Sequence, residues 1–218
     1  NLARRVVAAR AVRQDEPHPH CAVASPDNRF VLVADLGIDA VMSYSLDGGR
    51  LRLASTFRTA PGAGPRHLSF SSAGDVVYLI NELDSTVCSL AYAADTGTLA
   101  LLQTVSTVPE GARAANRCSE IVLSPDGRFA YAANRGDDSI AILALGDAGA
   151  LTRTANVPAG GRVPRNIALD PSGRYLFSAN QESGNLVWFR RDEVDGTLQQ
   201  AGETAIGSPM CVLPVGRS

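Results

Sequence analysis

Ser124-Pro-Asp-Gly-Arg-Phe-Ala-Tyr-Ala-Ala-Asn134 is the stretch that decides the fold, because the chain contains four gap-free versions of it. It begins with a Pro-Asp-Gly turn and continues as an apolar and aromatic run of strand length. The starts of the four versions are separated by 46, 53 and 46 residues. The other versions are Ser25-Pro-Asp-Asn-Arg-Phe-Val-Leu-Val-Ala-Asp35, Ser71-Ser-Ala-Gly-Asp-Val-Val-Tyr-Leu-Ile-Asn81 and Asp170-Pro-Ser-Gly-Arg-Tyr-Leu-Phe-Ser-Ala-Asn180.

The residues around each version complete a four-stranded unit. A short apolar segment such as His67-Leu-Ser-Phe70 precedes the turn, and a further strand such as Ser139–Leu145 follows a short polar loop. A hairpin turn, for example Asp47-Gly-Gly49, then leads to a last strand. Four strands in about 46 residues, without a sustained helical period, are typical of a propeller blade. A β-sandwich would not explain the gap-free repeat, so we predict an all-β fold, a β-propeller of four-stranded blades.

The repeat also predicts the domain organisation. We expect one propeller domain over residues 1–218, with four full blades and a closing strand that follows Ser208-Pro209. A ring of six to eight such blades needs roughly 280–370 residues. We therefore expect the chain to be the C-terminal portion of a longer ring whose missing N-terminal blades lie upstream. The predicted blades cover about 18–60, 64–108, 117–158 and 163–206, and the predicted closing strand covers 208–215.

Composition excludes several classes of function. The 218 residues include 20 basic and 22 acidic residues, which argues against a nucleic-acid partner because such proteins need a basic face. Every basic residue is arginine, so Schiff-base chemistry and a phosphate-binding loop with its lysine are excluded. No apolar run approaches the ~18 residues of a membrane span, so we expect no membrane partner.

The cysteines indicate neither a metal site nor a disulfide framework. Cys21, Cys88, Cys118 and Cys211 are far apart, with no pair at metal-ligand spacing. We read them as reduced thiols, mostly buried, which fits a reducing cytosol and a cytoplasmic location, although a disulfide stays open. We expect no metal and no other cofactor.

The register of the blades indicates where chemistry lies. Two positions recur in every blade. One lies five residues before the turn motif, and the other directly follows the strand after that motif. Both belong to loops at the same edge of the blade. In a ring, that edge surrounds the mouth of the central channel, so polar residues there should converge on one pocket. These residues are His20, Arg66, Glu82, Arg135, Arg165 and Gln181.

The neighbouring positions His67, Glu120 and Asn166 lie either in that pocket or between blades, since strand neighbours face opposite ways. Several arginines at one mouth make a site for a small anion, because guanidinium forks match carboxylate or phosphate oxygens. Histidine and glutamate beside them can transfer protons. The structural alternative for any single pair, such as Arg66 with Glu82, is a salt bridge between blades.

The chain resembles the seven-bladed β-propeller lactonase family, which includes bacterial 6-phosphogluconolactonases and fungal carboxy-muconate lactonizing enzymes. The resemblance covers nearly the whole chain from about residue 13, and its motifs are specific only together. They are Arg13-Gln14 with Pro17-His-Pro-His20, Asp35-Leu-Gly37, Gly62-Ala-Gly-Pro-Arg-His67, Asn81-Glu82, Ser119-Glu-Ile121, Ser124-Pro-Asp-Gly127, Asn134-Arg-Gly136 and Pro164-Arg165 with Ala179-Asn-Gln181.

The resemblance implies hydrolysis of a sugar-acid lactone, with 6-phosphogluconolactone as the best-known substrate. The one histidine, two arginines and one glutamate proposed for the fungal relatives correspond to His20, Arg66, Arg135 and Glu82. The two arginines, with Arg165, would hold the anionic lactone and its oxyanion. His20 or Glu82 would activate water, and the other would protonate the departing ring oxygen.

We assign substrate binding to Arg165, Gln181, His67, Glu120 and Asn166. Two alternatives stay open. One is a cycloisomerase that closes a muconate-type diacid to a lactone. The other is a non-catalytic propeller that binds a partner at its mouth, although its expected rim aromatics are scarce at 6% aromatic residues.

Overall fold

The computed structural model describes residues 13–113 and 115–216, and in this part the chain is all-β. Its strands form four antiparallel sheets of four strands each, so the predicted four-stranded blades are confirmed. The first blade contains β1 (Pro19–Ala24), β2 (Phe30–Asp35), β3 (Ala40–Asp47) and β4 (Arg50–Arg58). The second contains β5 (Pro65–Phe70), β6 (Val76–Asn81), β7 (Thr86–Ala93) and β8 (Thr98–Ser106). The third contains β9 (Arg117–Leu123), β10 (Phe129–Arg135), β11 (Ser139–Leu145) and β12 (Leu151–Pro158). The fourth contains β13 (Pro164–Leu169), β14 (Tyr175–Asn180), β15 (Asn185–Arg191) and β16 (Leu198–Ala205).

Each blade is a meander, in which every strand pairs with its neighbours in sequence. Two short 3-10 turns, η1 (Glu110–Ala112) and η2 (Asp147–Gly149), lie in the connections. The described part of the chain has no helix of the length and apolarity that a membrane crossing requires.

The turn that recurs in the repeat makes the same hydrogen bond in each of the four blades. In every blade the first residue of the motif accepts, through its side chain, a hydrogen bond from the backbone amide that opens the second strand. The fourth residue of the motif has a left-handed backbone, which glycine adopts at Gly127 (φ 69°) and asparagine at Asn28 (φ 58°). The four bonds are Phe30 N to Ser25 Oγ (3.0 Å), Val76 N to Ser71 Oγ (3.1 Å), Phe129 N to Ser124 Oγ (2.9 Å) and Tyr175 N to Asp170 Oδ1 (2.8 Å).

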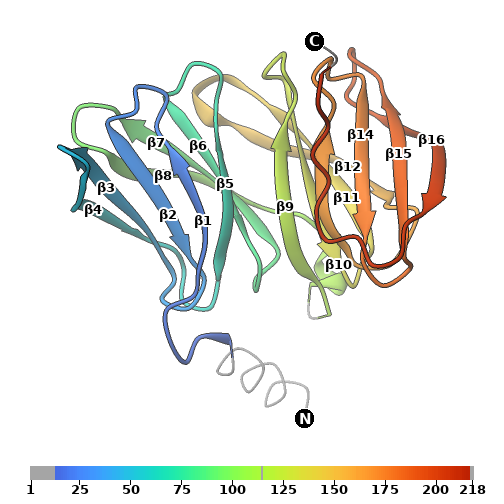
Figure 1. The fold of residues 1–218 in the computed structure, drawn as a ribbon, viewed down its shortest axis with the longest axis horizontal. Helices are drawn as coiled ribbons and strands as arrows, with labels where there is room; N and C mark the ends of the chain where they lie inside the picture. Colours follow the sequence, from blue (N-terminus) through green and yellow to red (C-terminus); the bar gives the residue numbers. More distant parts are fainter. Residues whose placement is uncertain (1–12, 114, 217–218) are drawn as a thin grey trace.

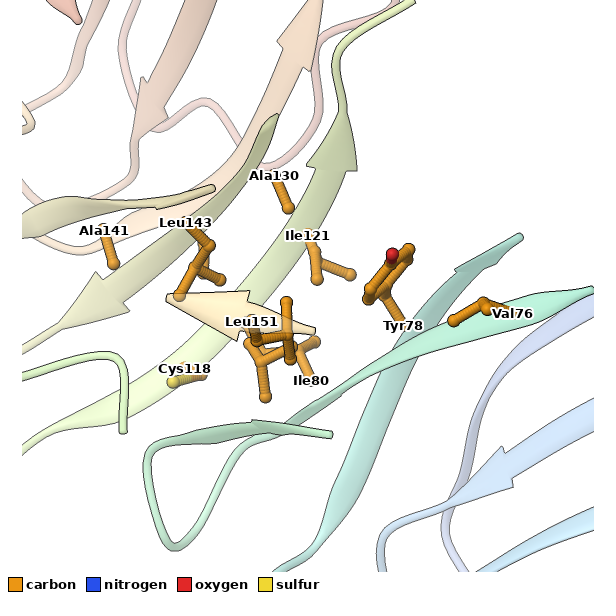
Figure 2. Close-up of a cluster of buried hydrophobic side chains, with 11 residues drawn as sticks. Val76, Tyr78, Ile80, Cys118, Ile121, Ala130, Ala141, Leu143 and Leu151 are labelled. Carbon is orange, nitrogen blue, oxygen red and sulfur yellow. The ribbon is translucent and has the colours of Figure 1, made fainter. Parts of the chain in front are cut away.

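The core lies between blades, because the second and third strands of a blade are buried on both faces. Along β6, Tyr78 and Ile80 pack toward the third blade, whereas Val77 and Leu79 pack toward the first. Figure 2 shows the former pair facing side chains of the third blade, among them Leu143. A strand of near-continuous apolar sequence is what burial on both faces requires.

The first strands of successive blades lie side by side around a common channel (Figure 1). β1 contacts β5, β5 contacts β9, and β9 contacts β13. The far ends of these inner strands line one apolar cavity of about 550 Å³, with Val23, Phe70, Val122 and Leu169 contributed by the four blades in turn. The inner strands therefore converge, and residues at their opposite ends meet at the channel mouth.

Residues 206–216 carry no strand in this structure, and the expected closing strand over 208–215, which would join a blade with its other strands upstream, stays a prediction. The segment runs beside β13, where the backbone amide of Val212 donates to the side-chain oxygen of Asn166 at 2.9 Å. The inner strands of neighbouring blades contact each other through side chains and not through backbone hydrogen bonds. Residues 206–216 would therefore form a strand only with further strands of their own sheet. Before the first blade, residues 14–16 form bends.

Replacing Leu143 with Ala tests the packing between blades. Leu143 is fully buried between the second and third blades, so its truncation should lower the free energy of unfolding by about 2–5 kcal/mol. Leu101→Ala, the same change at a residue that is 55% exposed, should cost well under half as much. Urea denaturation of both variants measures the difference, and equal losses would contradict burial between blades.

Candidate functional site

A β-bulge opens the inner strand of each blade at the channel mouth. The pairing register shifts between Pro19 and Cys21, between Pro65 and His67, and between Pro164 and Asn166. The third blade has the equivalent irregularity, in β9 opposite β10. Bulges re-aim side chains and are frequent beside active sites. The bulged residues are His20, Arg66, Arg165 and, in the third blade, Ser119 with Glu120.

The second set of predicted positions follows the second strand of each blade. Glu82 follows β6, and its backbone is held by hydrogen bonds with Gly64 of the same blade and Cys118 of the next. Arg135 ends β10. The equivalent residue of the first blade is Leu36, which is fully buried and apolar. Blades two and three therefore supply the charged members of this set.

Glu82 is the centre of a buried ionic cluster, defined here as Glu82 with Arg13, Arg66 and Arg135. Its Oε2 lies 3.0 Å from Arg66 Nε and 2.8 Å from Arg135 Nη2, and its Oε1 lies 3.2 Å from Arg13 Nη2. Glu82 and Arg66 are almost fully buried, whereas the Arg13 side chain is half exposed. One carboxylate thus faces three guanidinium groups, and the ionic cluster carries net positive charge.

The protonation of the cluster follows from its geometry. Burial alone raises the pKa of Glu82, but Arg135, Arg13 and Arg66 outweigh it, and the pKa ends below its usual value. Burial, together with the charge of Arg135, lowers the pKa of Arg66 to about 10. At neutral pH the carboxylate is therefore ionised and Arg66 is positively charged.

The arginines are also bound to backbone carbonyls, Arg66 to one of the next blade and Arg135 to one of its own blade. Arg66 Nη1 donates to the carbonyl of Ser119, and Arg135 Nη2 donates to the carbonyl of Cys118 at 2.8 Å. Ser119 in turn donates through Oγ to the carbonyl of Pro164 in the fourth blade, at 2.6 Å. The Nε atom of Arg135 is buried without a hydrogen-bond partner among the described residues, which leaves one desolvated donor at the site.

His20 lies next to the ionic cluster as a neutral imidazole. Burial lowers its pKa to about 4, and the positive charge of Arg66 adds to the effect. Glu82 acts in the opposite direction but does not compensate. The ring centroid of His20 lies 5.3 Å from that of His67.

The neighbouring positions form a hydrogen-bonded line across three inner strands, which we call the inner-strand line. His67 Nδ1 lies 2.6 Å from Glu120 Oε1, and Asn166 Nδ2 donates to Glu120 Oε2 at 2.7 Å. His67 and Glu120 are partly exposed, at 23% and 12% of their side chains. These residues connect β5, β9 and β13, so their contacts run between neighbouring blades.

The remaining predicted site residues, Arg165 and Gln181, make few polar contacts. Arg165 is half-buried and makes no hydrogen bond or ion pair with residues 13–113 or 115–216, although its charge contributes to the lowered pKa of Arg66. The carbonyl of Gln181 accepts a hydrogen bond from Ser208 Oγ at 3.1 Å. Its side chain joins neither the ionic cluster nor the inner-strand line within the described part of the chain.

Arg13 is the member of the ionic cluster that the blade register misses. It precedes the first blade, so no equivalent position in the repeat points to it, and only its place in a family-like motif marked it. The adjacent Gln14 fixes the segment, because its Nε2 donates to the carbonyl of Leu36 at 2.9 Å and to Asp39 Oδ1 at 2.8 Å.

Comparison with known proteins gives a consistent family. The family model described as lactonase, 7-bladed beta-propeller matches residues 4–214. A 6-phosphogluconolactonase of Bacillus subtilis is 38% identical over 202 residues, which cover 92% of this chain and 58% of the relative. A 6-phosphogluconolactonase of Formosa agariphila is 40% identical over 195 residues, which cover 86% of this chain and 54% of the relative.

Solved structures agree. A protein from Lactobacillus plantarum has a TM-score of 0.88 at 35% identity, covering 91% of this chain and 58% of the other. A periplasmic gluconolactonase of Pseudomonas aeruginosa has a TM-score of 0.84 at 36% identity, covering 90% of this chain and 56% of the other. The chain therefore spans a little over half the length of these relatives.

The titration of His20 tests the electrostatics of the site. By NMR of histidine-labelled protein, His20 should titrate with a pKa of about 4, and Arg66→Met should raise that pKa because a nearby positive charge is removed. The unfolded chain takes up this proton near pH 6.5, so acid between pH 6.5 and 4 should favour unfolding. Arg162→Met, at a guanidinium that is 67% exposed, serves as the control and should have no effect. A wild-type pKa near 6.5 would contradict the burial of His20 beside Arg66.

Proposed function

This chain belongs to the lactonase family of seven-bladed β-propellers, and from that premise we propose that the full-length protein hydrolyses the lactone of a sugar acid. The observation that carries the proposal is the ionic cluster, in which three guanidinium groups share one buried carboxylate beside a neutral imidazole. Such an excess of positive charge suits a small anionic substrate. The names of the relatives from Bacillus subtilis and Formosa agariphila favour 6-phosphogluconolactone as that substrate.

The proposed substrate pocket depends on blades beyond the four described here. Four blades are described, and the family has seven, so the full-length protein would have further blades beyond those of residues 18–206. Such blades would enclose the channel, which the four inner strands line from one side only. We expect the substrate pocket to be complete only in that ring.

In the proposed mechanism the arginines bind the anion and the developing oxyanion. Each guanidinium has five N–H groups, and Arg66 and Arg135 use only some of them on Glu82 and on backbone carbonyls. The unpartnered Nε of Arg135 gives one desolvated donor that a substrate oxygen would satisfy. Arg165, which is free of described partners, would bind the phosphate or a hydroxyl group of the substrate.

Water provides the nucleophile. A lactone is a cyclic ester, so hydrolysis adds the hydroxyl of water to the carbonyl carbon, breaks the bond to the ring oxygen and delivers a proton to that oxygen. His20 is neutral at pH 7 and can take the proton from water. Glu82 has both oxygens occupied by guanidinium groups, so we assign it to holding Arg66 and Arg135 in place rather than to a proton transfer.

We infer a cytoplasmic location from the cysteines. All four are free thiols, and burial raises the pKa of Cys118 to about 12, which keeps that thiol protonated. Free thiols are typical of reducing compartments. Fractionation of cells that express the full-length protein tests the location.

A substrate panel tests the proposed reaction. The full-length protein should release acid from 6-phosphogluconolactone in a pH-stat, faster than from gluconolactone because the phosphate adds charge for the arginines to bind. Ultraviolet assays on muconates examine the cycloisomerase alternative. Lactonization of muconates with no lactone hydrolysis would overturn the proposal, as would inactivity on both classes.

Arg165→Ala tests the assignment of an anion-binding residue. Because Arg165 has no described partner, its loss should leave the thermal transition within about 1 °C while it raises KM for the phosphorylated lactone. A charge-assisted hydrogen bond of about 1.5–3 kcal/mol corresponds to roughly a 10–150-fold rise. The matched control Arg162→Ala, on the same blade but exposed, should leave KM unchanged. An unchanged KM in Arg165→Ala would contradict the assignment.

A further inference from the structure

The mechanism above leaves the second proton transfer without a residue. The departing ring oxygen of a sugar lactone is an alkoxide, which leaves readily only when an acid protonates it. Glu82 is ionised and bound on both oxygens, so it has no proton to give. His20 is neutral and is already used as the base. Another proton donor at the channel mouth is required.

His67 has the geometry of such a donor. Its Nδ1 lies 2.6 Å from Glu120 Oε1. A carboxylate can only accept hydrogen bonds, so Nδ1 carries the hydrogen of this contact. The second nitrogen, Nε2, has no hydrogen-bond partner among the described residues. The side chain is 23% exposed, which leaves this nitrogen accessible to a substrate.

Glu120 is itself held rigidly. The backbone amide of Ile121 donates to its Oε1 at 3.1 Å, and Asn166 Nδ2 donates to its Oε2 at 2.7 Å. Asn166 is held in turn through the backbone amide of Val212, which donates to Asn166 Oδ1 at 2.9 Å. This fixes the amide orientation, since the oxygen of Asn166 accepts and its nitrogen donates. Each member of the inner-strand line thus has a defined partner, as a group that orients a catalytic histidine should.

We propose that His67 is the general acid that protonates the departing ring oxygen through Nε2, and that Glu120 and Asn166 are its positioning residues. The inference rests on the proposed lactone hydrolysis. In the step, His20 takes one proton from water, the hydroxyl adds to the carbonyl carbon, and the bond from that carbon to the ring oxygen breaks. His67 delivers its Nε2 proton to that oxygen. The proton on His20 then returns to His67, whose ring centroid is 5.3 Å away.

The contrasting environments of the two histidines fit the roles of His20 as general base and His67 as general acid. His20 is partly buried near Arg66, whereas His67 is in direct contact with a carboxylate. Pairs of titratable groups in opposing environments are the usual sign of an acid and a base.

The groups that face His67 come from the elements packed around β5. They are His20 from β1 and Glu120 from β9, with Arg66 adjacent to His67 in β5 itself. The acidic residue of β2, Asp35, instead binds the backbone amides of His18 and Gly37.

The test compares leaving groups in the full-length protein. His67→Gln should lower kcat for 6-phosphogluconolactone by about 100-fold, the lower range for loss of a general acid. With dihydrocoumarin, whose phenolate leaves without protonation, the same variant should lose less than about 3-fold. The matched control is His18→Gln, which removes the other histidine in contact with a carboxylate, at Asp15 on the surface (3.4 Å), and should not change either rate. Equal losses of His67→Gln on both substrates would overturn the role.

Glu120→Gln gives an independent measurement if dihydrocoumarin is not accepted. This variant keeps a hydrogen bond to His67 but removes the charge, so the alkaline limb of the kcat–pH profile should move to lower pH. A merely structural role would lower activity without moving that limb, and an unmoved limb would overturn the proposal. A wild-type protein inactive on every lactone would instead refute the proposed function itself.

Discussion

Burial of the second and third strands on both faces is the constraint on which the arrangement depends. A strand such as β6, with Tyr78 and Ile80 on one side and Val77 and Leu79 on the other, is stable only with an apolar sheet on each side. Sheets that satisfy this condition stack face to face, and their natural twist arranges them around an axis. The inner strands then converge, and loops from different blades meet at the channel mouth although more than 100 residues separate His20 from Arg135.

Electrostatics at the mouth follow from one buried carboxylate. Without Glu82, three guanidinium groups would lie close together with nothing to offset their repulsion. With it, the ionic cluster remains net positive and leaves guanidinium donors for an anionic ligand. Burial, with the charge of Arg66 added to it, lowers the pKa of His20 and keeps that ring neutral. A structural ion pair and an anion site are compatible here, because Glu82 pairs with Arg66 within the second blade and with Arg135 of the third blade, and both pairs orient guanidinium donors.

The sequence predicts the blades and most of the charged residues at the mouth, because equivalent positions in a repeat occupy equivalent places in the ring. Arg66, Glu82 and Arg135 come together for this reason. The contact of His67 with Glu120 could not be predicted, since the bulge at the start of each inner strand breaks the two-residue alternation on which side-chain direction depends. Arg13 lies before the repeat, so no equivalent position in the blades predicts its contact with Glu82. Residues 208–215 would form a strand only with a neighbouring strand to pair with.

The central claim is that side chains from separate blades form one anion-binding pocket at the channel mouth. A crystal structure of the full-length protein with 6-phosphogluconate, the product of the proposed reaction, tests it most directly. The account predicts that the ligand binds at the mouth, with its charged oxygens on Arg66, Arg135 and Arg165 and its other polar groups beside His20 and His67. A ligand bound elsewhere, with these side chains unchanged and uncontacted, would contradict it.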